Sequence, residues 1–235
     1  KIKDKDKNTP LHSAVESIHD PAKSLLAVQL LMAADADNFA VQQVDSDGNL
    51  VLHCACEHKQ PNPEVIKLVM EAYPLGLQKK DKDGNLPLHS ALEVGDVMPA
   101  DIIEEMLKLY PGACLVADRD HNYPVHCCFH ECKESLEKKA MMVIDAGPKA
   151  LAEKSRKLKQ CLLFHAVQSR RYSDQLVAKL ANAYPKGCEV KDAEGNIPLH
   201  LELERGDGAK MEVVKILVEA SPSSVKIKDR DKNTP

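Results

Sequence analysis

The sequence contains few aromatic residues and no long apolar run. Aromatic residues make up 3% of the 235 positions and tryptophan is absent, so a buried core must consist mainly of Leu, Val, Ile, Ala and Met. No run of about eighteen apolar residues occurs, so no membrane-spanning helix is predicted. The lysine-rich segment 1–7 has no apolar stretch behind it that could serve as a secretory signal.

An excess of positive charge is also missing. The chain has 32 Lys and Arg against 36 Asp and Glu, a net charge of -4. This balance supplies no general attraction for nucleic acid or for an anionic membrane surface. We therefore predict neither a nucleic-acid partner nor direct membrane insertion. Eight cysteines are spread over residues 54–188, which suits a reducing compartment better than a disulfide framework, so we predict an intracellular protein, most simply cytoplasmic, with an organelle left open.

A four-residue pattern ending in histidine recurs along the chain. Its spacing is 41, 36, 37, 39 and 35 residues, which indicates six repeated units. The pattern occupies residues 9–12, 50–53, 86–89, 123–126, 162–165 and 197–200. Upstream of several of these tetrads lies Asp-x-Asp-Gly-Asn or a relative of it, as at residues 45–49, 81–85 and 192–196, a composition that predicts a tight turn.

A second periodic marker is proline. Five prolines lie 37 residues apart, and three of them follow a tyrosine. Each comes after an apolar stretch, where a proline is expected to end a helix. The order in each unit is therefore predicted to be turn, short helix, loop and longer helix. The five are Pro74, Pro111, Pro148, Pro185 and Pro222.

These motifs resemble the ankyrin repeat, whose signature includes Asp-x-x-Gly-x-Thr-Pro-Leu-His-x-Ala, and the resemblance covers essentially the whole chain. The chain is similar to a slightly long variant with Tyr-Pro after the second helix. The resemblance implies an all-α solenoid of six helix-turn-helix units with β-hairpin or turn tips, in which each unit buries its apolar face against its neighbours. We expect a single array over residues 1–235, with units near 4–44, 45–80, 81–117, 118–156, 157–191 and 192–228 and the start of a seventh at 229–235.

The fifth unit departs most from the pattern. It has Lys-Leu-Lys-Gln-Cys at residues 157–161 in place of the turn, and Leu163 where the tetrad proline is expected. A cluster of basic residues surrounds this site, which suggests either a solvated surface or a contact for an acidic or phosphorylated partner segment. The cluster consists of Lys154, Arg156, Lys157, Lys159, Arg170 and Arg171.

Glutamate recurs four residues after the tetrad histidine. The six units carry Glu16, Glu57, Glu93, His130, Ser169 and Glu204 at this position. If the ankyrin geometry holds, neighbouring side chains would lie roughly 8–10 Å apart on the concave face and form an acidic groove for a basic peptide or helix. His130 and Arg170 would interrupt it. The alternative is that glutamate is simply a good exposed helix former.

Three segments partly match motifs that bind zinc, calcium or phosphate. The segment 126–132, His-Cys-Cys-Phe-His-Glu-Cys, places pairs of ligand-type residues on shared helix faces, yet His126 and Cys128 occupy positions with structural roles in the repeat, so no metal is predicted. With Gly84 at position six of a calcium loop, positions one and twelve are Lys79 and Ser90 rather than carboxylates. The segment 206–210 lacks the spacing of a phosphate-binding loop. We predict no cofactor and no enzymatic activity.

The two ends of the chain are nearly the same. Residues 226–235 repeat residues 1–10 with one difference, at an offset of 225 residues. Duplication of a six-unit block and coincidence among similar turns both remain open. The seventh unit is started and not completed, so we expect a fragment of a longer chain.

We predict a non-enzymatic scaffold that binds a protein partner through its concave face and tips. The alternatives are a structural spacer in a large assembly, using convex or end surfaces, and a regulatory segment of a larger enzyme or channel. Partners are expected to include a basic peptide or helix in the groove and an acidic segment near the fifth unit. The predicted contact residues are Lys5, Lys7, Glu16, Ser46, Glu57, His58, Lys82, Glu93, Arg119, His130, Lys159, Arg170, Glu204 and Arg205.

Overall fold

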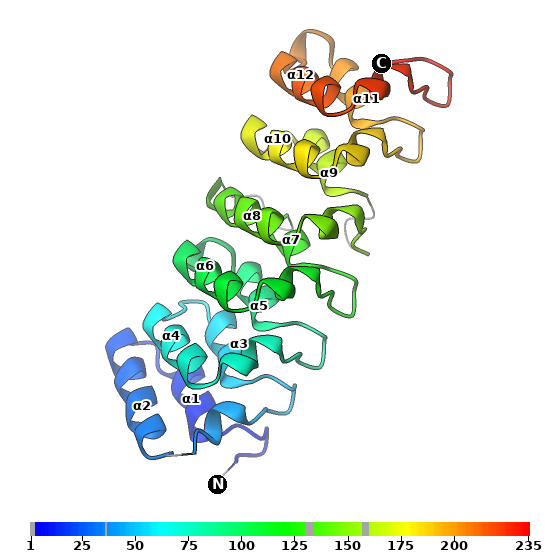
Figure 1. The fold of residues 1–235 in the computed structure, drawn as a ribbon. Helices are drawn as coiled ribbons and strands as arrows, with labels where there is room; N and C mark the ends of the chain where they lie inside the picture. Colours follow the sequence, from blue (N-terminus) through cyan, green and yellow to red (C-terminus); the bar gives the residue numbers. More distant parts are fainter. Residues whose placement is uncertain (1–2, 36, 130–133, 157–159) are drawn as a thin grey trace. The chain divides into compact units, whose positions relative to one another are not determined.

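The computed structural model describes residues 3–35, 37–129, 134–156 and 160–235. The chain divides into two compact units, unit 1 over Lys1–Arg119 and unit 2 over Asp120–Pro235. Each unit is built from pairs of α-helices with short 3₁₀ helices between them (Figure 1). In the described part of the chain there are twelve α-helices and no β-strand, and an isolated bridge joins Val44 and Leu50. The predicted all-helical repeat is therefore confirmed, with turns at its tips.

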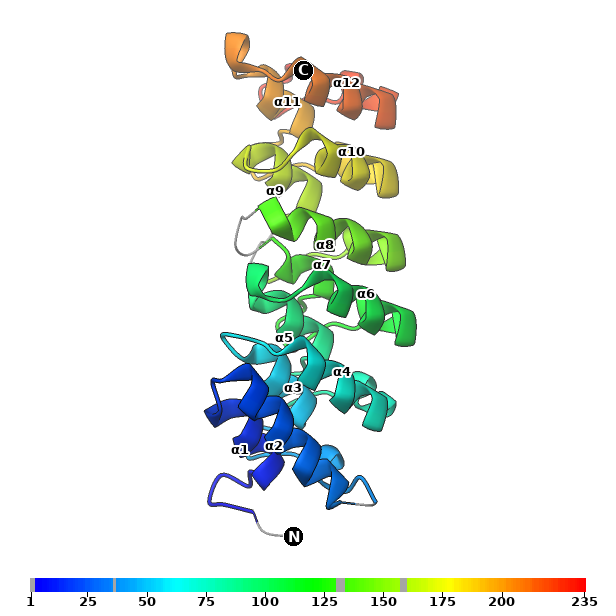
Figure 2. The same cartoon turned by 90° about the vertical axis from the view of Figure 1, so that its left-hand side faces the viewer.

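Unit 1 contains three helix pairs. The first helices stack in one layer and the second helices in another, as Figures 1 and 2 show. The elements are α1 (Pro10–Ser17), α2 (Pro21–Ala33), η1 (Ala40–Gln42), α3 (Val51–Glu57), α4 (Pro63–Ala72), η2 (Pro74–Gln78), α5 (Pro87–Glu93), η3 (Gly95–Val97), α6 (Ala100–Leu109) and η4 (Pro111–Leu115).

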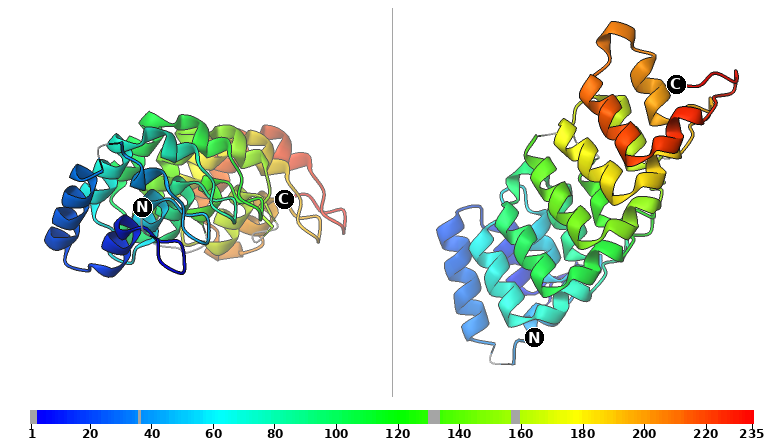
Figure 3. Two further views of the ribbon diagram at one scale, coloured as in Figure 1. Left: turned by 90° about the horizontal axis from the view of Figure 1, so that it is seen from below. Right: turned by 45° about the horizontal axis from the view of Figure 1, so that its top comes forward.

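Unit 2 repeats this plan with three further pairs. Its second helices α8, α10 and α12 lie side by side, and α9 packs on α11 (Figure 3). The elements are α7 (Pro124–Cys127), α8 (Glu134–Ala146), η5 (Pro148–Ala152), α9 (Leu162–Ser169), α10 (Asp174–Ala183), η6 (Pro185–Glu189), α11 (Pro198–Leu203), η7 (Gly206–Gly208), α12 (Met211–Ala220) and η8 (Pro222–Lys226).

The periodic prolines end the second helices as predicted. Tyr73, Tyr110 and Tyr184 terminate α4, α6 and α10 with φ near -140° and ψ near +75°, outside the helical region. Crowding by the proline ring disfavours the helical conformation of the residue before it. The proline then starts a short 3₁₀ helix, where its missing N–H is not needed.

In α1, α3 and α11 the tetrad histidine fastens the first helix to the next tip. In α3, Nδ1 of His53 accepts a hydrogen bond from the N–H of Leu50 at 3.2 Å, so Nε2 carries the proton and donates to the carbonyl oxygen of Asn85 at 3.2 Å. His12 and His200 make the same pair of contacts. In these three repeats the histidine is thus a structural link to the neighbouring repeat, whereas Nε2 of His165 in α9 has no hydrogen-bond partner among the described residues.

One face of each second helix forms the core. In α4 the side chains of Val65, Ile66, Val69 and Met70 are all 1% exposed or less, and their spacing of three and four residues puts them on one side of the helix. The first helices supply the opposing apolar residues, including Leu52 and Leu88. Small residues at the position two after the histidine, such as Ala55 and Ala91, allow the helices to approach closely.

Candidate functional site

Glutamates lie at or near the ends of the first helices of unit 1. Glu16, Glu57 and Glu93 occupy equivalent places in α1, α3 and α5, and all three are exposed. The hydroxyl of Ser90 donates a 2.8 Å hydrogen bond to Oε1 of Glu57, and the thiol of Cys54 lies within 4.8 Å of a carboxylate oxygen of Glu16. Ser90 and Cys54 each belong to the repeat that follows, so these carboxylates also connect consecutive repeats.

A hollow of about 600 Å³ lies between the first two of these glutamates, and we name it the unit 1 hollow. The rings of His19 and His58 lie side by side with their centroids 5.5 Å apart and their planes inclined by 37°. These side chains come from α1, from α3 and from the loops that follow each helix. The lining includes Glu16, His19, Cys54, Glu57, His58 and Lys59.

The carboxyl of Glu57 lies in an environment that is short of positive charge. Protein atoms desolvate it on one side and raise its pKa, and the negative charges of Asp81 and Glu93 raise the pKa further, while the hydrogen bond from Ser90 lowers it. Desolvation disfavours the ionised form, and so do nearby like charges. A cation bound beside Glu57 would offset both effects, because its attraction stabilises the ionised form.

Three possible metal ligands also meet at this end of unit 1. Oxygen atoms of Glu16 and Asp45 and the sulfur of Cys54 lie within 4.8 Å of one another. Asp45, however, holds its own turn, because its Oδ1 accepts hydrogen bonds from the backbone N–H groups of Asp47 and Asn49 at 2.7 and 2.8 Å. Burial raises the pKa of the Cys54 thiol, and the charge of Glu16 raises it further, so the thiol keeps its proton. These structural roles account for the cluster, and we assign no metal to it.

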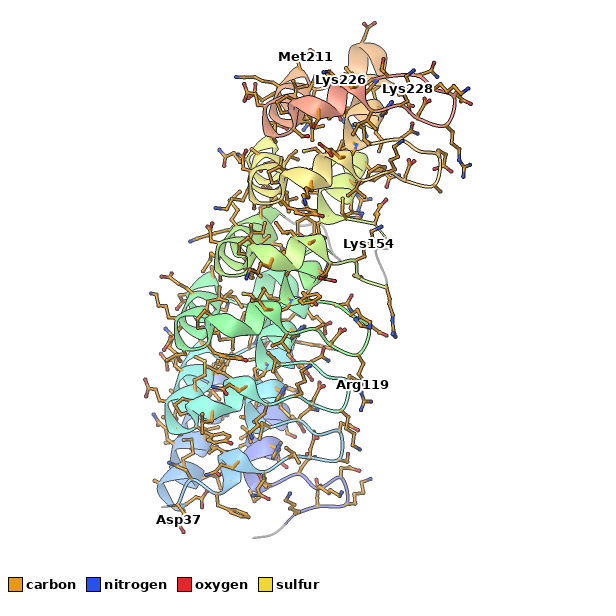
Figure 4. All side chains as sticks on the ribbon, turned by 45° about the vertical axis from the view of Figure 1, so that its right-hand side comes forward. Asp37, Arg119, Lys154, Met211, Lys226 and Lys228 are labelled. Carbon is orange, nitrogen blue, oxygen red and sulfur yellow. The ribbon has the colours of Figure 1, made fainter. Side chains whose placement is uncertain are left out.

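The predicted contact residues at the tips of unit 1 are exposed or partly so. Lys5, Lys7, Lys82 and Arg119 are exposed and Ser46 is half-buried. Figure 4 shows the side chain of Arg119 extending away from its tip. The backbone beneath them is ordered by hydrogen bonds from tip to tip, which run from the N–H groups of Ser46, Lys82 and Arg119 to the carbonyl oxygens of Asp6, Asp47 and Asp83 at 2.7, 2.9 and 2.9 Å.

In unit 2, two predicted contact residues are used in packing between repeats. Nη2 of Arg205 donates to the carbonyl oxygens of Val167 and Gln168 at 3.0 and 3.3 Å, at the end of α9. In the opposite direction, Nη2 of Arg170 donates to the carbonyl oxygen of Gly208 at 2.8 Å. We name this pair of crossed contacts the arginine clasp. Its hydrogen bonds use part of the donor capacity that a partner would need.

The clasp depends on Glu202, a residue that the sequence reasoning missed. Glu202 is 1% exposed and forms an ion pair with Arg205, and its Oε1 accepts the N–H of Lys210 at 2.7 Å. It occupies the position that Ala14, Ala55 and Ala91 hold in other units. The sequence did contain a signal for this role, because Glu202 stands where other repeats have a buried alanine. A carboxylate buried at that position needs a charged or hydrogen-bonding partner.

The fold has clear counterparts among solved structures. The ankyrin repeat domain of Bcl-3, described as a unique member of the IkappaB protein family, matches with a TM-score of 0.69 and 21% identity, over 98% of this chain and 93% of that one. The human ASB11 ankyrin repeat domain matches with a TM-score of 0.59 and 18% identity, over 96% of this chain and 89% of that one. This chain has the ankyrin-repeat fold. No family model matches the sequence, and no curated protein matches it.

The remaining predicted contact residues of the ankyrin repeats differ in exposure, and some lie outside the described residues. Glu204 is exposed just after α11, and His58 is half-buried in the unit 1 hollow. His130 and Lys159 lie outside the described residues, as does Lys157 of the basic cluster. The groove proposed from sequence therefore rests on the three glutamates of unit 1.

The basic cluster of the fifth repeat is only partly available. Arg156 lies 4.0 Å from the carboxylate of Asp120, whereas Lys154 is exposed (Figure 4). Lys154 and Lys191 line a second hollow of about 310 Å³. Nζ of Lys191 already donates to the carbonyl oxygen of Lys228 at 2.6 Å. Lys154 can therefore meet an anion at this hollow.

The two units of ankyrin repeats differ in charge. Unit 1 has 12 Lys and Arg against 19 Asp and Glu, a net charge of -7, whereas unit 2 has 20 against 17, a net charge of +3. The acidic character of the chain therefore resides in unit 1, together with the three glutamates. A search of the described helices for one long and apolar enough to cross a bilayer finds none.

Proposed function

We propose that this chain is a non-enzymatic protein-binding scaffold whose unit 1 binds a basic segment of a partner. The supporting observation is the unit 1 hollow, because carboxylates from two consecutive repeats line it within a unit of net charge -7. Charge complementarity of this kind accelerates association and selects partners by sign. The contact residues of the proposal are Glu16, Glu57, Glu93 and His58, with Lys5, Lys7, Ser46, Lys82 and Arg119 at the tips.

The two solved relatives are named for their ankyrin repeat domains, and that name alone does not define a partner. Fold similarity therefore supports a scaffold in general terms, and the choice of a basic partner comes from the charges of this chain. An intracellular location is part of the proposal. The seven cysteines in the described residues are free and buried, which favours a reducing compartment.

The test is binding of lysine- and arginine-rich peptides to the whole chain, measured by fluorescence anisotropy. We compare the native chain with the triple variant Glu16→Gln, Glu57→Gln and Glu93→Gln. The matched control is Glu212→Gln with Glu219→Gln, two exposed glutamates of α12 in unit 2. We expect the triple variant to weaken binding at least about tenfold, which corresponds to about 1.4 kcal/mol, and the control to leave it unchanged.

Salt provides the second arm of this test. Binding through exposed carboxylates should weaken steeply between low and high salt, because ions screen such charges. If basic peptides bind equally well to the native chain and to the triple variant at both salt concentrations, the groove is not their site. A spacer role through other surfaces, or a regulatory segment of a larger enzyme or channel, would then be the better account.

A second candidate is an acidic segment bound near the fifth repeat. Lys154 is exposed beside a hollow of about 310 Å³, and its unit has a net charge of +3. The variant Lys154→Gln should weaken the binding of a phosphorylated or glutamate-rich peptide, and Lys215→Gln on the exposed side of α12 serves as its control. Equal binding by both variants would remove this candidate.

A further inference from the structure

We propose that the unit 1 hollow accepts an arginine side chain of the basic partner in preference to a lysine. The guanidinium would lie against the carboxylate of Glu57, with its flat face against the rings of His19 and His58. This inference rests on the proposed function, because it names the side chain through which the basic segment would be anchored.

The hollow has the size and construction that a long side chain requires. At about 600 Å³ it lies within the range of sites that hold small ligands. Glu16 comes from α1 and Glu57 from α3, while His19 and His58 come from the two loops that follow these helices. A side chain that enters would therefore meet acceptors and rings from two repeats at once.

The carboxylate of Glu57 is held in place and still has acceptor capacity. Its Oε1 accepts the hydroxyl of Ser90 at 2.8 Å, which restricts the orientation of the group. No donor among the described residues hydrogen-bonds to its Oε2. An ionised carboxylate can accept about four hydrogen bonds, so both oxygens can receive the parallel N–H groups of a guanidinium.

The paired imidazoles provide the basis for discrimination. Their centroids are 5.5 Å apart and their planes differ by 37°, so they present two neighbouring ring faces. A guanidinium is planar, weakly hydrated and stacks on aromatic faces, whereas the ammonium of lysine is a compact and strongly hydrated charge. Two carboxylates alone would attract either cation. The two imidazole rings favour the planar guanidinium of arginine over the ammonium of lysine.

The charge around the hollow supports a bound cation. Among the described residues that line it, Lys59 is the single cationic side chain, against Glu16 and Glu57. Asp45, Asp81 and Glu93 add further negative charge close enough to act on Glu57. The single positive charge of Lys59 is therefore outnumbered by these carboxylates, and the net charge around the hollow is negative.

The experiment is a proton NMR titration of the whole chain with N-acetyl-arginine amide and, separately, with N-acetyl-lysine amide at neutral pH. The imidazole signals of His19 and His58 are assigned with the single variants His19→Gln and His58→Gln. We expect the arginine amide to shift both signals along a saturable curve, with an affinity at least about threefold higher than that of the lysine amide. Equal affinities for the two compounds would overturn the arginine preference.

Variants separate the contribution of the Glu57 carboxylate from that of the imidazole rings. Glu57→Gln should weaken binding of the arginine amide about fivefold to tenfold, because it removes a charge-assisted pair, and Glu212→Gln should have no effect. His58→Phe should keep the preference for arginine, whereas His58→Gln should remove it. If both His58 variants behave as the native chain does, the rings do not recognise the guanidinium.

The result also distinguishes this inference from the proposed function. If basic peptides bind to unit 1 but the arginine amide leaves the His19 and His58 signals in place, only the arginine site is wrong. If neither the peptides nor the amide binds, both proposals fail.

Discussion

The hydroxyl of Ser90 donates a 2.8 Å hydrogen bond to Oε1 of Glu57 and thereby joins the third repeat to the second. One repeat earlier, the equivalent pair brings the sulfur of Cys54 within 4.8 Å of a carboxylate oxygen of Glu16. Glu57 thus has two roles, because its bond with Ser90 stabilises the stack and its carboxylate still has acceptor capacity for a partner. Substitution by glutamine keeps the acceptor for Ser90 and removes the charge, which makes Gln the appropriate probe for binding.

The first prediction concerns the buried ion pair of the sixth repeat. Glu202→Ala leaves Arg205 without its carboxylate and the N–H of Lys210 without its acceptor. Removing one member of a buried pair costs about 3–5 kcal/mol, so we expect a loss of about 3 kcal/mol in the free energy of unfolding of α11 and α12. Amide hydrogen exchange of α11 and α12 in the native chain and the variant measures this free energy.

The control for this prediction is Glu204→Ala, at an exposed position two residues away. It should change the same free energy by less than about 0.5 kcal/mol. The double variant Glu202→Ala with Arg205→Ala should cost less than the sum of the single variants, because neither charge is then left alone. Additive losses would show that the pair does not act as a unit.

The second prediction concerns the tetrad histidines. His53→Ala removes a buried ring, which is 0% exposed, together with its hydrogen bonds to the N–H of Leu50 and the carbonyl oxygen of Asn85. Two lost hydrogen bonds and a cavity predict destabilisation of about 2–4 kcal/mol in urea unfolding. His58→Ala, at a half-buried loop position, should cost much less. Similar losses for both would mean that His53 is not a structural link.

The third prediction concerns pH. Desolvation by burial lowers the pKa of His12, His53 and His165 from the ordinary value of 6.5. The unfolded chain then binds more protons than the folded chain around and below pH 6.5, so stability is complete above that value and is lost as the pH falls through it. We expect the urea midpoint to decrease between pH 7.5 and pH 5.5.

Glu57 acts in the opposite direction at lower pH. Its pKa in the folded chain is raised above 4.5, so protonation of this carboxyl favours folding as the pH falls through the raised pKa toward 4.5. Repeating the titration between pH 7.5 and pH 5.5 on the Glu57→Gln variant therefore isolates the contribution of the histidines. A midpoint that stays constant across this window would contradict the assignment of neutral, buried imidazoles.

The fourth prediction concerns the tip of the third repeat. Gly84 has φ +86°, and a Cβ there would lie 3.0 Å from the backbone nitrogen of Arg119. Gly84→Ala should therefore disturb the hydrogen bond from Arg119 to Asp83 as well as strain the turn, with a loss of about 2 kcal/mol or more. Gly95→Ala is the matched control, because Gly95 has φ +69° and open space around it. Equal losses of stability for the two variants in thermal unfolding would show that backbone strain alone destabilises them and that the contact with Arg119 does not contribute.

Much of the fold could be predicted from local patterns. The tetrads mark the start of each first helix, and the residues before Pro74, Pro111 and Pro185 end second helices, because these effects act between residues a few positions apart. The repeated spacing then indicates six units without knowledge of any contact. The acidic position at Glu16, Glu57 and Glu93 could also be found in this way.

The tertiary structure alone decided what each exposed or charged residue does. Arg170 and Arg205 appeared to be surface cations in the sequence, but they bond to carbonyl oxygens 37 or 38 residues away in the neighbouring repeat. The meeting of Glu16, Glu57, His19 and His58 around one hollow likewise depends on how two repeats stack. Periodicity determines where a repeat begins and ends, because that is set within a few residues of chain. The partners of its side chains are set by the atoms that the next repeat places opposite them, and these follow only from the packed structure.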